Sequence, residues 1–273
     1  MNAFFKSLTV IVFTLAFSIV GNAQCEDMGY TLSIEPFIVH SGAYSDGVDL
    51  SGYTTYHIYL HFPTDQDFIG LVKGNPDTPT QFYSPTPFWQ SDFGGVTADN
   101  LDPDDFDLHP SAEYDSFVSI GKLHTDDPGA DIGINIDFVE QWNAIFENGN
   151  SFTMHDPDEE VWFTSGFSSG TNPNGYPDDD LKVVLGQVTT QSSVGVCITA
   201  TVFQNGEIDA PLDITLCGST EGITGCTDPA ACNYSIFNCT DDGSCEGDAA
   251  CFDEGATNYN PDESCANVYC MYL

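Results

Sequence analysis

Hydrophobic and polar residues alternate along several short segments between residues 30 and 217. In the segment TYHIYLHF, residues 55–62, the even-numbered positions carry Tyr, Ile, Leu and Phe, and the odd-numbered positions carry Thr, His and Tyr. A period of two residues is typical of a half-buried strand. Similar segments are DSFVSIG, IGINIDF, LKVVLGQVTT and GVCITATVF, and the loops between them are rich in Pro, Gly, Asp and Asn, which favour turns.

This succession of short strands predicts a mainly β fold over residues 24–218. Parallel strands need long helical crossovers, which the pattern does not provide, so we expect the strands to pair antiparallel. The prediction is an antiparallel β-sandwich of jelly-roll or immunoglobulin-like topology. One short helix is expected inside it, with Asp137 as the cap, Glu140 three residues on and Asn148-Gly149 at the end. The apolar face of that helix would consist of Phe138, Trp142, Ile145 and Phe146.

The first 23 residues have the layout of a secretory signal peptide. Lys6 precedes an apolar run over residues 8–20, and the small residues Gly21 and Ala23 follow it. The run is shorter than the roughly 20 residues of a membrane-spanning helix, which argues against a membrane anchor. Acylation of Cys25 is a further alternative. We expect cleavage after Ala23 and a secreted, extracellular or cell-surface protein with no membrane span.

Acidic residues greatly outnumber basic ones. The chain has 42 Asp and Glu against 4 Lys and Arg, and its formal net charge is −38. Such a surface repels phosphate groups, so nucleic acid is excluded as a partner. The carboxylates form either a solvated coat that dissolved salt would screen, or a surface that includes Ca²⁺ sites. Hydrophobic residues still make up 41% of the chain, which is enough for a folded core.

Beyond residue 218 the strand pattern stops and cysteines become frequent. Seven of the ten cysteines lie in residues 219–273. Two units can be overlaid there, 226–245 and 251–270, and both begin with C-x-D-x-x-A-x-N-Y. The chain therefore divides into a signal peptide (1–23), a β-sandwich domain (24–218) and a small, loop-rich region of two acidic repeats (219–273).

The cysteines are best explained as disulfide bonds. Structural zinc sites need close cysteine pairs or histidine partners, but successive cysteines of the first unit are separated by five or six residues and no His follows His155. Redox sites need C-x-x-C, which the region does not contain. Units too small to bury a core are commonly held by disulfides outside the cell. The spacing predicts the bridges Cys226–Cys245, Cys251–Cys270, Cys232–Cys239 and Cys197–Cys217. Cys25 and Cys265 are left open, either bridged to each other or free to bond another chain.

The first unit, GCTDPAACNYSIFNCTDDGSC, resembles a known family of repeats. These are the acidic, cysteine-stapled GCTDPxAxNYxxxAxxDDGSC repeats of secreted and cell-surface proteins of marine Bacteroidetes. The second unit keeps the opening half but has ANVYC in place of DDGSC. The segments YDSFVSIG and LKVVLGQVTT are similar to β-rich domains that accompany such repeats. The resemblance implies an extracellular location and a modular surface architecture, whereas the function of such domains is unassigned.

Catalytic motifs are scarce. GFSSG, residues 166–170, matches a nucleophile elbow around Ser168, but the following residues do not predict a helix and no His comes later. His57 and His61 share one strand face about 13 Å apart, too far to hold one metal, and are expected to be exposed polar residues. An extracellular hydrolase is therefore a remote alternative, and we expect that the protein is not an enzyme.

Acidic loops provide the candidate metal ligands, with Ca²⁺ as the candidate cofactor. In the first repeat, the outer disulfide would bring Asp228, Asp241 and Asp242 near one another. In the loop NPNGYPDDD, the candidates are Asp178 and Asp180. These loops do not match the EF-hand pattern, and solvated turns are the alternative.

An aromatic stretch, QFYSPTPFWQSDFGG at residues 81–95, provides a candidate ligand-binding site. Phe82, Tyr83, Phe88 and Trp89 could form a stacking platform for sugars on a proline-punctuated loop. The alternative is that these side chains line the core.

Together these features predict a secreted or cell-surface structural or interaction protein of the adhesion type. Its acidic loops would be stiffened by calcium, and its repeats would act as a stalk or spacer. Expected partners are extracellular proteins or glycans, or a further copy of the chain. A carbohydrate-binding module that uses the aromatic loop is the alternative.

Overall fold

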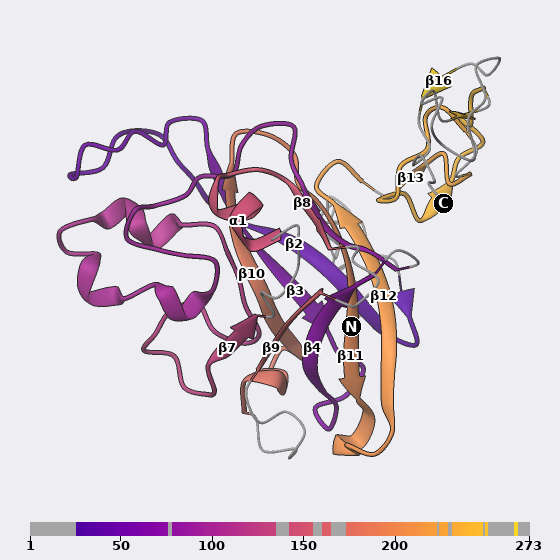
Figure 1. Cartoon of the computed structure of the whole chain (residues 1–273), viewed down its shortest axis with the longest axis horizontal. Helices are drawn as coiled ribbons and strands as arrows, with labels where there is room; N and C mark the ends of the chain where they lie inside the picture. Colours follow the sequence, from indigo (N-terminus) through magenta and orange to yellow (C-terminus); the bar gives the residue numbers. More distant parts are fainter. Residues whose placement is uncertain are drawn as a thin grey trace, which may run out of the picture.

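The computed structural model describes most of the chain. The described residues are 26–75, 78–134, 142–154, 160–164, 173–222, 224–228 and 231–247, with the backbone of two short strands at 249–250 and 265–266. They confirm a mainly β fold with antiparallel sheets packed as a sandwich. In Figure 1 the strands occupy the centre, the loops of residues 98–114 lie on one side, and the cysteine-rich segment lies beyond the end of β12.

The first sheet has five strands in the order β1-β2-β3-β10-β6. Their bounds are Glu26–Asp27 (β1), Tyr30–Val39 (β2), Thr54–His61 (β3), Lys182–Thr190 (β10) and Phe117–Val118 (β6). β3 lies between β2 and β10, and both pairings are antiparallel. Gly186 marks a shift in the register of β10, and a Cβ there would lie 2.6 Å from the carbonyl oxygen of Phe117. A residue with a side chain would therefore push the edge strand β6 away.

The second sheet has seven strands and is built around β11. Their bounds are Ile132–Ile134 (β7), Glu160–Thr164 (β9), Phe68–Gly74 (β4), Gly195–Phe203 (β11), Thr80–Tyr83 (β5), Phe152–Met154 (β8) and Pro211–Ser219 (β12). β12 pairs with the whole of β11, whereas β4 and β5 share its opposite edge. All nine residues of β11 are buried, because β11 is covered along both edges and on both faces.

Short helices and minor strands complete the described structure. α1 is Trp142–Glu147; the 3-10 helices are Ala98–Asn100, Pro103–Asp105, Pro110–Tyr114, Pro173–Gly175 and Gln204–Gly206; the minor strands are Thr224–Gly225 (β13), Thr240–Asp241 (β14), Ala249–Ala250 (β15) and Cys265–Ala266 (β16). No helix in the described part of the chain is long and apolar enough to cross a membrane.

The main core lies between the two sheets and follows the alternation read from the sequence. Ile58 and Leu60 of β3 are completely buried, as are Trp162 of β9 and Val196 of β11. The indole N–H of Trp162 donates to the carbonyl oxygen of Ser119, 3.1 Å away, so its burial leaves no polar group unmet. This core holds the two sheets together.

The opposite face of β3 is also covered, which corrects one prediction. His57 was expected to be exposed, but only 6% of its surface is accessible. Phe37 stacks on its ring with centroids 4.5 Å apart, and its Nε2 lies 2.9 Å from Oε1 of Gln187. Thr55 on the same face is fully buried and lies 2.8 Å from Nε2 of His40. The local alternation could not reveal this second layer, because residues far away in the sequence provide it.

Helix α1 agrees with the predicted helix where it is described. Trp142 and Phe146 are buried, and Gly149 has φ +76° just after the helix end. Its N–H donates to the carbonyl of Phe146, as in a glycine C-cap. Ile145 is 37% exposed, however, so the prediction that it shares the buried face is wrong. The predicted cap, Asp137 with Glu140, lies outside the described residues.

Two of the four predicted disulfides are confirmed. Cys197 of β11 and Cys217 of β12 are bonded across directly paired positions, with Cα atoms 4.0 Å apart. Cys226 and Cys245 close the first repeat. Cys232 and Cys239 are also disulfide-bonded, although the bond of one to the other stays a prediction. The predicted pair Cys251–Cys270, like Cys25, lies outside the described residues, and Cys265 is described only as part of β16.

Candidate functional site

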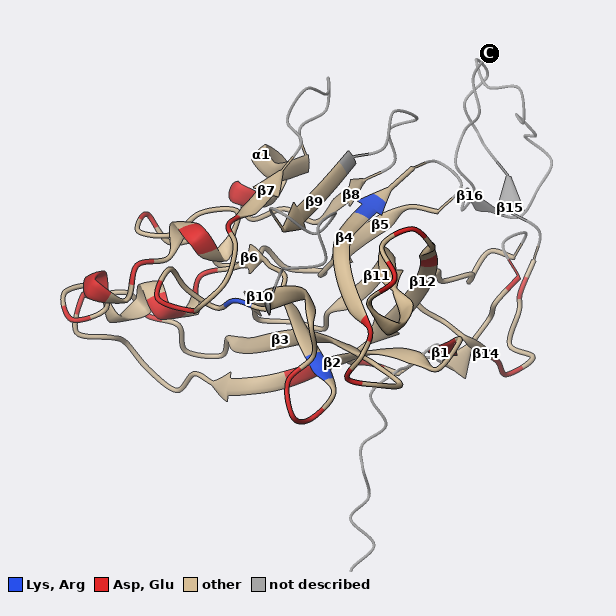
Figure 2. Ribbon diagram, turned by 90° about the horizontal axis from the view of Figure 1, so that it is seen from below, with Lys and Arg blue, Asp and Glu red and all other residues tan. Residues whose placement is uncertain are grey.

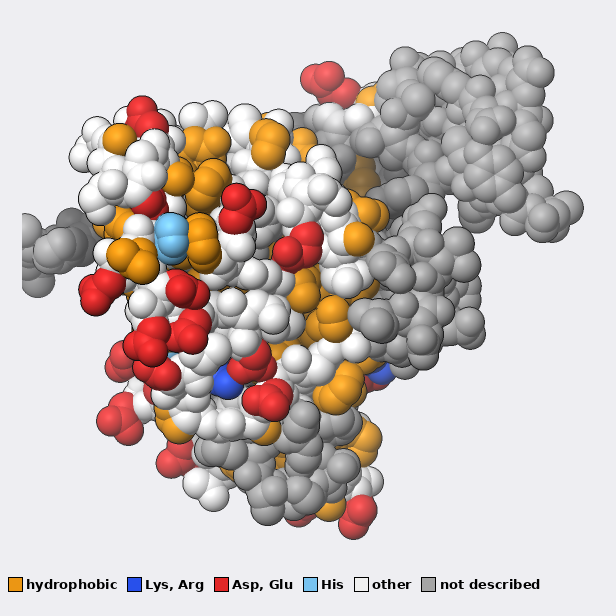
Figure 3. Space-filling model, turned by 60° about the vertical axis from the view of Figure 1, so that its left-hand side comes forward, with side chains coloured by type: hydrophobic (Ala, Val, Ile, Leu, Met, Phe, Trp, Pro, Cys, Tyr) orange, Lys and Arg blue, Asp and Glu red, His pale blue; other side chains and the backbone are white. Residues whose placement is uncertain are grey.

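Each described lysine forms an ion pair with a carboxylate. Lys73 lies 2.8 Å from Asp213, Lys182 lies 3.3 Å from Glu35, and Lys122 contacts Asp99. Within the described ranges, every lysine is therefore in an ion pair. Figure 2 shows Asp and Glu concentrated in the loops, and Figure 3 shows carboxylates spread between hydrophobic patches on one face. The charge that remains free at the described surface is almost entirely negative.

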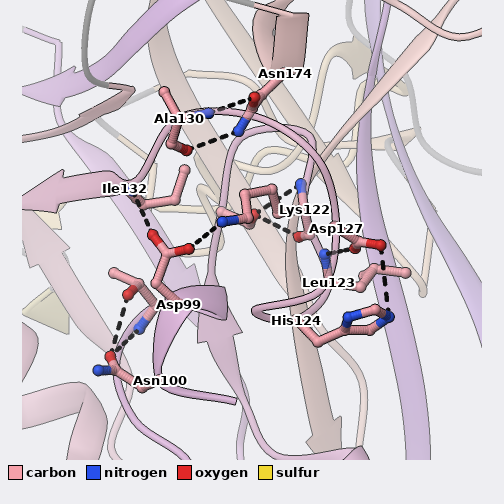
Figure 4. Close-up of polar contacts among 11 residues, drawn as sticks. Asp99, Asn100, Lys122, Leu123, His124, Asp127, Ala130, Ile132 and Asn174 are labelled. Carbon is pink, nitrogen blue, oxygen red and sulfur yellow. Dashed lines mark hydrogen bonds and ion pairs between the residues drawn. The ribbon is translucent and has the colours of Figure 1, made fainter. Parts of the chain in front are cut away.

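The pair of Lys122 and Asp99 is the most enclosed of the three. Only 3% of the Lys122 side chain and 19% of the Asp99 side chain are accessible. Lys122 Nζ contacts Oδ1 of Asp99, and the backbone N–H of Ile132 donates to Oδ2 (Figure 4). The sequence neighbours of both residues take part in a small apolar cluster, which contains Ala98, Leu101 and Phe117, with Phe106 and Leu123 packed against it.

An acidic loop, residues 121–131, extends from this pair. Oδ2 of Asp127 accepts from the N–H of Leu123 at 2.6 Å, and Oδ1 lies 3.5 Å from Nε2 of His124. The side-chain amide of Asn174 binds both the N–H and the carbonyl of Ala130, each at 2.9 Å (Figure 4). The loop is thus fixed at its start, middle and end, while Asp126 and Asp131 remain exposed.

Asp115 organises a second acidic region. It is completely buried, and its two oxygens accept from the N–H groups of Ser91 (2.7 Å) and Gly95 (3.0 Å). A Cβ at Gly94 would overlap Oδ2 of Asp115, so the loop requires glycine there. Burial raises the pKa of Asp115 to about 7, and these backbone donors oppose the rise. No local pattern in the sequence indicates this role, because the hydrogen-bond donors lie 20 and 24 residues before Asp115.

The predicted metal ligands do not converge in the described structure. Oδ1 of Asp178 accepts from the N–H groups of Asp180 and Lys182, and Asp242 accepts from Ser244. These carboxylates therefore cap turns. Among the residues that the structure describes, no group of three or more His, Cys, Asp or Glu side chains could hold a metal ion, and this includes the set Asp228, Asp241 and Asp242. Calcium binding stays a prediction.

The first cysteine repeat is ordered by its asparagines. Nδ2 of Asn233 donates to the carbonyl of Ser244 at 2.7 Å, and Oδ1 accepts from the N–H of Glu246 at 2.8 Å. This double contact ties the C-x-D-x-x-A-x-N-Y half of the repeat to its DDGSC half. Nδ2 of Asn238 donates to the carbonyl of Cys226 at 3.1 Å. The Asn that both repeats share in C-x-D-x-x-A-x-N-Y is the sequence signal that could have indicated this role.

The same repeat packs against the edge of the sandwich. The rings of Phe237 and Tyr83 are stacked with centroids 6.0 Å apart. Gly195, at the start of β11, allows this approach, because a Cβ there would lie 2.8 Å from the Phe237 ring. The contact sets the position of the repeat relative to β5 and β11.

The aromatic platform predicted for sugars does not form as proposed. Phe82 is fully buried and stacks on Phe152, and Phe88 is 3% exposed and packs on Phe146. Tyr83, which points out of β5, is 42% exposed and contacts the first repeat. Trp89 is half-buried, and its enclosed indole nitrogen has no hydrogen-bond partner among the residues that the structure describes. The prediction is wrong for Phe82 and Phe88, which belong to the core.

A Ser-His contact on the outer face of the first sheet does not have the arrangement of a nucleophile and its base. Ser33 Oγ lies 2.7 Å from Nε2 of His61, but it donates its proton to Oε1 of Glu35 at 3.0 Å. Its oxygen therefore accepts from His61, and only 1% of Ser33 is exposed. The motif around Ser168 lies outside the described residues.

Comparison with known proteins returned no match to a family model, to a curated protein or to a solved structure. The fold and the contacts define a disulfide-bonded, mainly β protein with an acidic surface.

Gly121 should tolerate substitution far less than Gly47. Both have positive φ (+74° and +91°), but a Cβ at Gly121 would lie 2.1 Å from the carbonyl oxygen of Asn174, whereas nothing lies within 4 Å at Gly47. We expect Gly47→Ala to lower the free energy of unfolding by about 1 kcal/mol. Gly121→Ala should cost about 3 kcal/mol or more, because it adds overpacking to the backbone strain. Urea unfolding of the two variants checks this, and equal losses would contradict the packing of the acidic loop.

His57 should make the protein less stable as the pH falls. Burial lowers the pKa of His57 below 6.5, and the hydrogen bond to Gln187 only partly opposes this shift. The unfolded chain then binds the proton more readily, so the stability is present above the unfolded pKa and is lost as the pH falls through it. From about pH 8 to about pH 5, the free energy of unfolding should fall more in the wild type than in His57→Gln.

In the difference between these two proteins, the contributions of the other titrating groups to the pH dependence of the unfolding free energy cancel. His40 and His61, whose pKa values are lowered by burial, and Asp115, whose pKa is raised, are present in both. Urea unfolding across the pH range provides the measurement. Parallel pH profiles would contradict the buried, neutral state of His57.

Proposed function

We propose that the protein is a secreted or cell-surface interaction protein whose acidic sandwich is presented on disulfide-bonded repeats. The observation that carries this proposal is the pairing of Lys73, Lys122 and Lys182 with carboxylates. With those positive charges neutralised, the described surface offers partners a nearly uniform negative charge. Cations, and partners with cationic groups, are the ligands that such a surface attracts.

The disulfides support an extracellular setting. Cys197–Cys217 joins two strands that already pair over nine residues, and Cys226–Cys245 closes a repeat with little regular structure. Disulfides persist in oxidising compartments, which agrees with the leader-like first 23 residues and with the resemblance of the repeat to those of surface proteins.

The contact of Phe237 with Tyr83 supports a spacer role for the first repeat. A flexible linker would leave the sandwich free to rotate, whereas a stacked aromatic pair beside the Cys197–Cys217 bond fixes the exit direction of the chain. The repeat therefore acts as a stiff connection that presents the sandwich to its surroundings.

Calcium should stabilise the protein beyond the effect of ionic strength. The exposed acids within each of two turns, Asp178 with Asp180 and Asp241 with Asp242, repel each other, and a divalent cation relieves that repulsion more strongly than Na⁺. The measurement is the thermal unfolding midpoint during a CaCl₂ titration, with NaCl at matched ionic strength as the control. We expect a rise of several degrees over the control.

Variants then locate the effect. Asp241→Asn with Asp242→Asn tests the repeat, and Asp178→Asn with Asp180→Asn tests the loop before β10. If CaCl₂ and NaCl shift the midpoint equally, the carboxylates are a solvated coat and the calcium part of the proposal is wrong.

A further inference from the structure

Lys122 differs from the other described lysines in its surroundings. Its side chain is 3% exposed, against 15% for Lys73 and 20% for Lys182. Its carboxylate partner is also the most enclosed, at 19%, against 51% for Asp213 and 36% for Glu35. Removing an ammonium and a carboxylate from water costs several kcal/mol for each ion, unless all their hydrogen-bonding groups are satisfied.

The hydrogen bonds of Lys122 do not satisfy an ammonium group. An ammonium has three N–H donors, whereas Asp99 is the one partner of Nζ among the described residues. Ala98, the sequence neighbour of Asp99, belongs to an apolar cluster with Leu101 and Phe117, and this cluster offers no acceptor side chain. Among the described residues, two of the three donors of an ammonium at Lys122 therefore have no acceptor, whereas an amide nitrogen at this position has a single N–H to satisfy.

The carboxylate of Asp99 is held in one orientation (Figure 4). The N–H of Ile132 donates to Oδ2, and Oδ1 faces the nitrogen of Lys122. Cγ is therefore fixed beside the amine, with a backbone donor placed to hold the second oxygen as negative charge develops on it. Because the two reactive groups are already held in contact, their reaction is intramolecular, and this removes most of the entropic part of the barrier.

We propose that Lys122 and Asp99 condense into a side-chain amide bond. One proton first passes from the ammonium to the carboxylate, which gives an amine and a carboxylic acid in contact. Nζ then bonds to Cγ, the bond from Cγ to Oδ1 breaks, and Oδ1 leaves as water with two of the three ammonium protons. Oδ2 becomes the amide oxygen, still accepting from Ile132, and the amide keeps one N–H. The step balances without an oxidant or any other reactant.

The bond would link two positions 23 residues apart in the sequence. It would lock the 3-10 helix at Ala98–Asn100 to the start of the acidic loop 121–131. It would also remove one buried positive charge and one partly buried negative charge from the chain. Unlike an ion pair, such a link is insensitive to salt and to pH.

Trypsin tests this proposal directly, because the chain contains no arginine and only three lysines after residue 23. The protein is purified as the full secreted chain, then denatured, reduced, alkylated and digested. If Lys122 carries an amide, trypsin cannot cleave after it. The digest then contains residues 74–182 as one peptide, whose mass is lower than the sequence mass by one water molecule. Cleavage after Lys73 and Lys182 is the internal control.

Two variants confirm the assignment. Lys122→Arg keeps the positive charge but cannot form this amide, and Asp99→Ala removes the acceptor, so both should restore cleavage at position 122 and the full mass. The wild-type digest decides the question even if a variant fails to fold. Complete cleavage of the wild type after Lys122, with peptide 74–122 at its sequence mass, would show an ion pair only and overturn the proposal.

Discussion

The repulsion among carboxylates is the constraint on which the rest of this structure depends. A net charge of −38 opposes any compact state, and the described residues contain three lysines to offset it. The fold places each of these lysines in contact with a carboxylate, and one of these pairs, Lys122 with Asp99, is enclosed. Most other acids lie in loops and turns, where water reaches them and where many accept backbone N–H groups. Apolar burial between the sheets provides the opposing stabilisation.

Covalent and polar crosslinks act where the apolar core does not reach. The core ends at the sheet edges, and beyond it the chain is held by disulfides, by buried carboxylates such as Asp115 and by the side-chain amides of Asn174 and Asn233. Each amide binds an N–H and a carbonyl of another segment, so it makes the same pair of hydrogen bonds that a backbone amide would make in a neighbouring strand. These contacts give an acidic loop or repeat a defined shape without a core of its own.

The sequence predicted what depends on neighbouring residues. Alternation in 55–62 identified β3 and its core face, and the equal spacing of cysteines identified Cys226–Cys245. The prediction for the aromatic loop was wrong because β5 is only four residues long. Such a short strand, followed by a proline-rich segment, shows too little alternation to reveal that Phe82 faces the core. Contacts between distant segments were missed altogether: the cover over His57, the donors of Asp115 and the pairing of Lys122 with Asp99. A single sequence contains no periodic signal for such contacts, although the rarity of lysine was itself a clue that each one has a specific partner.

The dependence of stability on salt tests the central claim most directly. If repulsion between exposed carboxylates dominates, and the lysines contribute only three enclosed pairs, the free energy of unfolding should rise steadily as NaCl increases from about 0.01 M to about 1 M, where the screening length falls roughly tenfold. Urea unfolding at each salt concentration gives that free energy. A free energy that falls with added salt would mean that attraction between opposite charges dominates, and it would contradict the account.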